Sequence, residues 1–203
     1  TEALGDKKRY IACSRVTKRQ VFVFVSTDIK PSDSLQTFNF DDDYTFGIVN
    51  SALHWEWLKA KGSSLKGDYR YTSSSVWDTF PFPQSPTPVQ IKAVAEAGRN
   101  LHEFRRKRMA RSETITLREM YRLLEQPGSN PLRDLHETLD TAVMEAYGFD
   151  PTGDILAQLL ALNLEVARKI DAGETVTAPG IPPSYPTPDE LVSEGCIQPP
   201  DLI

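Results

Sequence analysis

The pattern of hydrophobic and polar positions divides the chain into a strand-rich first part and a helical second part. Two apolar runs, 9–16 (RYIACSRV) and 20–26 (QVFVFVS), are rich in β-branched and aromatic residues and flank a short polar segment, which is typical of paired strands. They predict a hairpin whose tip carries Arg15, Lys18 and Arg19. A weaker alternation predicts a third strand over 35–40.

A helical periodicity follows these strands. Apolar residues recur from Phe46 to Ala60 with helical spacing, which predicts one long helix over 44–61 with a buried stripe. Three aspartates at 41–43 provide an N-cap and negative charge for its first turn. Gly62 is expected to end the helix in the left-handed conformation. Two short strands are then expected over 68–72 and 75–80, before the prolines at 81 and 83.

The second half predicts four helices. Thr87-Pro88-Val89-Gln90 has the form of a capping box and begins a helix that runs to about residue 111. Further helices are expected over 117–125, from Asn130-Pro131 to Gly148, and over 153–172. Each has an apolar stripe that needs a partner, so a small bundle is expected. Prolines crowd the chain from residue 175 onward, which predicts an extended tail that is either wrapped on the surface or disordered.

Together these elements predict an α+β fold. We expect a mixed, β-rich N-terminal domain with one long helix (1–84), a helical spacer or bundle (85–172) and an extended, acidic, proline-rich tail (173–203). A length of 203 residues with 39% hydrophobic residues fits one or two domains with an ordinary core. No apolar run approaches the roughly 18 residues of a membrane span, so no membrane partner is expected.

The net charge of −5 is distributed unevenly along the chain. Residues 1–84 hold 11 Lys and Arg against 10 Asp and Glu, residues 85–172 hold 12 against 13, and residues 173–203 hold none against five. The acidity therefore lies in the tail, while positive charge gathers at 7–19 and at 105–111. Because local patches set the field that a ligand meets, a nucleic-acid partner is not excluded. The alternative is that both clusters are solvated faces.

Catalytic and metal-binding motifs are absent from the sequence. It contains no G-x-G-x-x-G, Walker loop, G-x-S-x-G or H-E-x-x-H, and it lacks the Asp/Asn/Ser-Pro-Pro-aromatic tetrapeptide of amino-methyltransferases. His54, His102 and His136 are isolated and have no metal-ligand spacing. Cys13 and Cys196 lie far apart, which favours a reducing compartment. We therefore predict no catalytic residue, no metal site and no cofactor within this chain.

The stretch 62–83 (GSSLKGDYRYTSSSVWDTFPFP) is the candidate binding surface. It holds Lys66, Asp68 and Arg70 among aromatic residues and continues into a run of hydroxyl side chains at 72–75. Arginine, lysine, serine and threonine are the side chains that donate to phosphates and base edges. The stretch therefore points to nucleic acid.

Four segments carry a resemblance to a known family. They are 9–16 (RYIACSRV), 44–51 (YTFGIVNS), 65–72 (LKGDYRYT) and 76–83 (VWDTFPFP). Together they resemble the target-recognition domain of MmeI-like, type IIG restriction-modification enzymes, which are large adenine-specific DNA methyltransferases. The helical stretch that ends at 139–149 (LDTAVMEAYGF) is similar to the spacer that follows this domain in the same proteins. The resemblance covers about residues 9–149, and the tail lies outside it.

This resemblance implies a division of labour. In the family, an upstream domain of the same polypeptide binds S-adenosylmethionine and methylates the N6 amine of a flipped adenine, and some members also carry a nuclease domain. The present chain, which lacks an initiating methionine, would be the C-terminal part of such a protein. It would read double-stranded DNA in a bacterial or archaeal cytoplasm, while S-adenosylmethionine is bound elsewhere in the parent protein.

The candidate DNA contacts follow from side-chain chemistry. Arginine pairs with guanine, asparagine or glutamine with adenine, and aspartate accepts from cytosine, whereas lysine and the hydroxyls suit phosphates. Asp68 has the alternative role of orienting Arg70. The aromatic residues of the stretch are expected mainly to pack inward. The predicted DNA-binding residues are Arg15, Lys18, Arg19, Asn50, Lys66, Asp68, Arg70, Ser73 and Ser74.

Two other functions stay open at this point. The helical half and the proline-rich tail suit a protein-interaction module, in which the basic segments are incidental. A free-standing hydrolase is disfavoured because no acid, base and nucleophile converge in the sequence. Salt dependence separates DNA reading from apolar docking, since only the former weakens steeply as salt rises.

Overall fold

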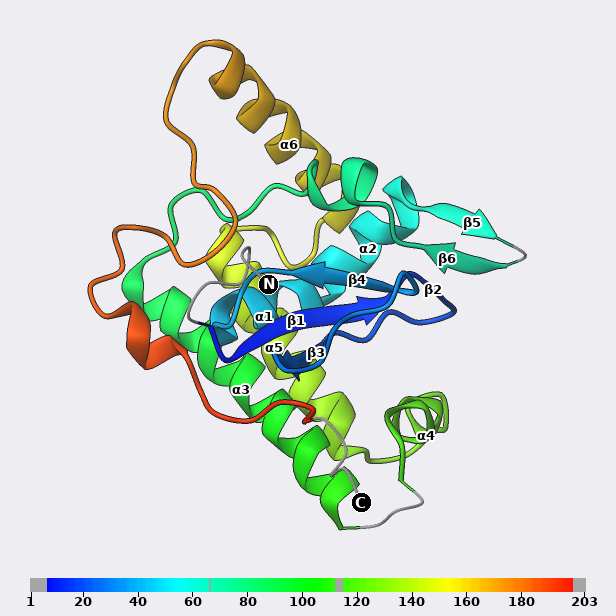
Figure 1. The fold of residues 1–203 in the computed structure, drawn as a ribbon. Helices are drawn as coiled ribbons and strands as arrows, with labels where there is room; N and C mark the ends of the chain where they lie inside the picture. The colour runs from blue at the N-terminus through cyan, green and yellow to red at the C-terminus, as the bar shows by residue number, and fades with distance from the viewer. Residues whose placement is uncertain (1–6, 66, 112–114, 199–203) are drawn as a thin grey trace.

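A computed structural model of the chain describes residues 7–65, 67–111 and 115–198, and it has an α+β fold (Figure 1). The first sheet has the antiparallel order β3 (Val23–Ser26), β1 (Arg9–Ser14), β4 (Leu35–Phe38). The second has the order β2 (Val16–Thr17), β6 (Asp68–Arg70), β5 (Ser63–Leu65). The α+β prediction is confirmed.

The predicted N-terminal hairpin is correct only in part. β1 pairs with β3 as expected, but the chain leaves the first sheet at Arg15 and enters the second, where Val16 pairs with Arg70. The prediction treated 9–16 as one strand because its apolar character is continuous, whereas the structure divides it between two sheets. The third strand is confirmed as β4.

The predicted long helix is wrong in one respect, since it is two helices, α1 (Asp43–Asn50) and α2 (Ala52–Lys61). Ser51 between them is extended, with φ −77° and ψ 160°. Its hydroxyl accepts from the His54 N–H and donates to the Ile48 carbonyl, and the Asp140 carboxylate accepts from the Ala52 N–H at 2.7 Å. A serine and an aspartate thus cap a helix inside a continuous apolar period.

Two further details of this region correct the sequence analysis. Gly62 ends α2 with φ −71°, not in the left-handed region. A Cβ atom there would lie 2.6 Å from the Leu58 carbonyl oxygen, so glycine suits a close approach at this point. Residues 75–80 form no strand, because Ser73–Trp77 is a π-helical turn (η2) whose Val76 carbonyl accepts from the Trp57 indole N–H at 3.1 Å.

The four helices of the second half are confirmed as α3 (Pro88–Ala110), α4 (Leu117–Leu123), α5 (Pro131–Tyr147) and α6 (Ile155–Asp171). The capping box between Thr87 and Gln90 is present at the start of α3. Gly148 ends α5 with φ 65°, in the left-handed conformation. α3 packs against α1 on one side and α5 on the other, while α6 packs mainly on α2.

The hydrophobic core is continuous across residue 84. One cluster joins Phe22 and Phe24 of the first sheet region to Ile91 of α3, Leu139 of α5 and Leu159 of α6. The strand-rich and helical parts therefore share their buried surface. The predicted boundaries at residues 84 and 172 stay predictions about the chain's organisation.

The described part of the tail, up to residue 198, is wrapped on the surface, one of the two predicted outcomes. It contains the short 3-10 helix η3 (Pro188–Leu191), and Tyr185 and Leu191 are buried. Ile197 adds a parallel bridge to β3, where its carbonyl accepts from the Ser26 N–H at 2.8 Å. Among residues 7–198 as described, no helix combines the length and apolar character that crossing a membrane requires.

Candidate nucleic-acid interface

The second sheet brings together several of the predicted contact residues. Arg70 of β6 lies directly between Val16 of β2 and Ser63 of β5, and these three side chains are exposed. Directly opposed residues share a face of an antiparallel sheet, so the three form a row, which we call the outer face. The β5–β6 hairpin and β2 project together beyond the helices (Figure 1).

The opposite face of this sheet packs on α2. Tyr69 contacts Trp55 edge to face, with 5.0 Å between ring centroids. Tyr71, which follows Arg70, is buried. Its N–H donates to the Arg15 carbonyl at 2.8 Å, and its hydroxyl lies 3.1 Å from Nε2 of His54. Burial lowers the pKa of His54 to about 3, so this ring is neutral and belongs to the core. The inner face of the sheet is therefore joined to α2 through Tyr69, and the chain enters the core at Tyr71, directly after β6.

Arg15, Lys18 and Arg70 present unengaged side chains. All three are exposed, and within the part of the chain that the structure describes none of them donates a side-chain hydrogen bond or forms an ion pair. An arginine in this condition keeps all five N–H donors for a ligand. Asp68 is half-buried on the same face as Arg70, two residues away. The structure thus brings Asp68 and Arg70 to one face, whereas Arg15 lies at the bend between β1 and β2, directly before Val16.

Arg19 and Asn50 lie elsewhere. The Arg19 guanidinium lies over the ring of Tyr121 in α4, 5.2 Å from its centroid. The Asn50 amide donates to the Phe46 carbonyl at 2.9 Å, and its oxygen accepts two bonds of 3.1 Å from Arg105. Both ends of this amide are therefore engaged within the fold. Asn50 therefore joins the end of α1 to α3 through its hydrogen bonds with Arg105.

The remaining predicted residues have mixed positions. Ser73 donates to the Gln36 side chain at 3.1 Å, which joins η2 to β4, whereas Ser74 is exposed. Lys66 lies outside the described residues. Two hydroxyls that border Arg70, Ser63 and Ser64, are exposed on the edge strand β5.

Arg105 is an important residue whose role the sequence analysis did not assign. It is only 2% exposed; it donates to the Phe22 carbonyl at 3.0 Å, to Asn50 and to the Tyr121 hydroxyl. Burial, and then the positive charge of Arg19, lower its pKa to about 9. The sequence does indicate this role, because Arg105 continues the apolar stripe of α3, and an arginine at a buried position must find hydrogen-bond partners inside the fold. Through Phe22 it holds the end of the segment between β2 and β3, which carries Lys18.

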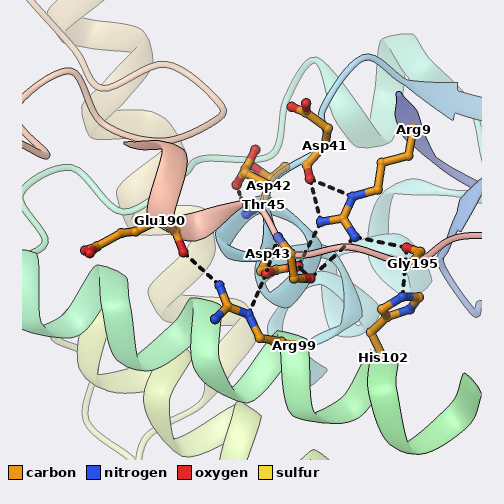
Figure 2. A network of polar contacts seen from close by, with 10 residues as sticks. Arg9, Asp41, Asp42, Asp43, Thr45, Arg99, His102, Glu190 and Gly195 are labelled. Atoms are coloured by element: carbon orange, nitrogen blue, oxygen red, sulfur yellow. Dashed lines mark hydrogen bonds and ion pairs between the residues drawn. The ribbon is translucent and has the colours of Figure 1, made fainter. Parts of the chain in front are cut away.

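A second buried network, around Asp43, joins the tail to the core (Figure 2). Asp43 is fully buried and accepts from Arg9 at 3.0 Å, from Arg99 at 2.9 Å and from the Ser193 hydroxyl at 2.8 Å. His102 donates from Nε2 to the Gly195 carbonyl at 3.0 Å, and burial and the charge of Arg9 lower its pKa to about 4. Every member has partners inside the fold, so this network is structural.

The described residues offer no set of three His, Cys, Asp or Glu side chains that would hold a metal ion. The two cysteines are free thiols: Cys13 is buried in β1 and Cys196 is half-buried in the tail. The candidate surface among the described residues is the polar outer face of the second sheet, with the exposed Arg70 at its centre.

Comparison with known proteins agrees with this geometry. Residues 6–84 match the family described as MmeI, target recognition domain. This segment is an MmeI-type target recognition domain. The match includes both sheets, α1, α2 and η2, and thus the whole outer face around Arg70.

Two relatives extend the similarity of the target recognition domain into the helices. DNA methyltransferase A of Bacillus subtilis (strain 168) is 32% identical over an alignment of 131 residues, and the match covers 62% of this chain and 14% of that protein. The solved structure of the type IIL restriction-modification enzyme MmeI in complex with DNA superposes with a TM-score of 0.68 at 24% identity, over 80% of this chain and 22% of that one. The chain therefore spans a small fraction of either relative, and the second likeness concerns the fold.

Proposed function

We propose that the chain is the DNA-recognition part of a restriction-modification methyltransferase, and that it reads base pairs of duplex DNA with the outer face of its second sheet. The observation that carries the proposal is Arg70, exposed and unengaged at the centre of this face, within a target recognition domain. Pairing of β6 with a strand on each side and the contact of Tyr69 with Trp55 fix the backbone at Arg70, and base reading demands side chains in fixed positions.

The DNA major groove is about 12 Å wide and admits a two-stranded β-ribbon, so β6 can enter it together with one neighbouring strand. In this arrangement Arg70 donates two hydrogen bonds to O6 and N7 of a guanine, and Arg15, at the bend before β2, contacts a second acceptor beside the face. Asp68 accepts from a cytosine amine or orients Arg70, to which it is adjacent on the same face.

Contacts to the DNA backbone follow at the edges of this face. We assign Lys18, Lys66 and Ser74, with the hydroxyls of β5, to phosphates, where they supply affinity without sequence information. Arg19 and Ser73 are assigned to the border of the interface, since each also contacts another element of the fold. Asn50 is left out of the interface because both ends of its amide are engaged.

The chemistry belongs to another part of the polypeptide in this proposal. The relatives named above are a DNA methyltransferase and a restriction-modification enzyme, and both are several times longer than this chain. A methyltransferase domain of the same polypeptide would bind S-adenosylmethionine and methylate adenine at N6. The residues described here would hold and select the DNA and take no part in methyl transfer.

Charge reversal at Arg70 on the outer face, combined with Arg15 at the bend beside it, tests the proposal. The 203-residue protein first selects its preferred duplexes from a random library. These duplexes are then titrated with the variant Arg15→Glu/Arg70→Glu. The control variant is Lys92→Glu/Arg168→Glu, which replaces exposed cations on α3 and α6. We expect the first variant to lose at least a hundredfold in affinity, and the control to bind as the unmodified protein does. The affinity of the unmodified protein should fall steeply with salt. Equal affinity of both variants would contradict the proposal.

An exposed apolar face supports a second candidate function, the docking of a protein surface. Leu164 and Ile170 of α6 are 69% and 58% exposed, although both are large hydrophobic side chains. A helix with such a face has more apolar surface than its contact with α2 covers. Leu164→Glu/Ile170→Glu would abolish such docking and leave DNA affinity unchanged.

A further inference from the structure

The outer face contains one apolar side chain that the proposed function has not yet used. Val16 is 40% exposed, and among the strand residues whose side chains the structure describes it is the one exposed large hydrophobic residue. Its cross-strand partner is Arg70, whose other neighbour is Ser63. A valine therefore lies beside Arg70 in an otherwise polar row.

Packing within the fold does not account for this position. β2 is only two residues long, and Thr17 and its partner Tyr69 occupy the face that lies against Trp55. Alternation directs Val16 the other way, together with Arg70. Val16 thus contributes little to the core, and its exposed methyl groups are available to a ligand that approaches Arg70.

We propose that Val16 contacts the 5-methyl group of a thymine in the base pair next to the guanine read by Arg70. The inference rests on the proposed function, in which the outer face enters the major groove. The thymine methyl is the apolar group that the major groove displays, and apolar side chains recognise it. Cross-strand neighbours lie about 5 Å apart and base pairs about 3.4 Å, so the two side chains address adjacent pairs.

This arrangement predicts one feature of the recognised DNA sequence. An A·T pair adjoins a G·C pair in it, with the thymine methyl turned toward β2. Replacing this thymine by deoxyuridine removes one methyl group and leaves every hydrogen-bonding group unchanged. One buried methyl corresponds to roughly a fourfold change in affinity.

The experiment combines this base change with a variant of the protein. The 203-residue protein selects its duplex from a random library, and each thymine is then replaced singly by deoxyuridine. We expect one thymine beside a guanine to show about a fourfold loss with the unmodified protein, and no loss with Val16→Ala. Val192→Ala is the matched control, because Val192 lies in the tail and is 41% exposed; it should keep the methyl dependence.

The outcomes separate the two proposals. If neither the unmodified protein nor any variant binds duplex DNA selectively, the proposed function fails and this inference fails with it. If selective binding occurs but its thymine dependence is the same in Val16→Ala, or no thymine adjoins a guanine in the selected site, the inference alone is wrong. Val16→Thr keeps the β-branched shape that suits a strand and provides a second variant; it should show a weaker methyl dependence than the unmodified protein.

Discussion

At the residue scale, arginine has two opposite roles in this protein. Arg70 is exposed with free donors, whereas Arg105 is buried and bonded to neutral groups of α1, of α4 and of the segment before β3. The sequence indicates the difference, because Arg105 continues an apolar stripe and Arg70 lies in a polar strand. The engagement of Asn50 could not be predicted in this way, since it depends on the distance between α1 and α3, which no local pattern contains.

The Asp43 network gives a prediction at this scale. Asp43→Asn removes the negative charge that the guanidinium of Arg9, itself 4% exposed, faces at 3.0 Å. Leaving such a cation without its partner should lower the free energy of unfolding by about 3–5 kcal/mol, measured by urea denaturation. Asp41→Asn is the control, because Asp41 forms a longer, partly exposed pair with Lys7 at 3.6 Å. It should cost less than about 1 kcal/mol, and equal losses in the two variants would argue against a structural role for the network.

At the element scale, the sequence predicts well where a local signal exists. The capping box at Thr87 and the end of a helix at Gly148 were both placed correctly. The break at Ser51 was missed because the apolar period continues through it and one of its caps, Asp140, comes from a distant helix. β5 was missed because Ser63-Ser64-Leu65 has no alternation, and its strand character comes from pairing with β6.

The contact between α1 and α3 gives the prediction for this scale. A Cβ atom at Gly98 would lie 2.6 Å from the Asp43 carbonyl oxygen, so the two helices must separate to accept alanine. Alanine favours a helix by about 1 kcal/mol over glycine, yet overpacking should outweigh this gain and lower the free energy of unfolding by about 1–3 kcal/mol. Asn100→Ala, at an exposed position of the same helix, should leave it nearly unchanged. Stabilisation by Gly98→Ala would show that the helices do not meet this closely.

At the scale of the whole molecule, the target recognition domain depends on later parts of the chain. Arg99 of α3 and Ser193 of the tail both bond to Asp43 at the start of α1, and Ile197 pairs beside β3. Composition predicted the separate acidic tail but not these contacts, because a proline-rich segment without periodicity has no signal for what it touches. The first sheet and α1 of the target recognition domain are thus held by residues of α3 and of the tail.

Two adjacent tail residues test this dependence. Leu191 is 2% exposed and Val192 is 41% exposed. If the tail is an integral part of the core, Leu191→Ala should lower the free energy of unfolding by about 2–5 kcal/mol. Val192→Ala should change it by less than about 0.5 kcal/mol. A negligible effect of Leu191→Ala in thermal or urea unfolding would mean that the tail is dispensable for the stability of the fold.

The central claim is that Arg70 reads one guanine. It is tested most directly by selecting duplexes from a random library with the unmodified protein and with Arg70→Ala, and by comparing the base preference of the two proteins at each position. The account predicts that preference disappears at a single G·C position, worth about 1–3 kcal/mol of discrimination, while the other positions and the unfolding temperature stay unchanged. An unaltered preference at every position would contradict it.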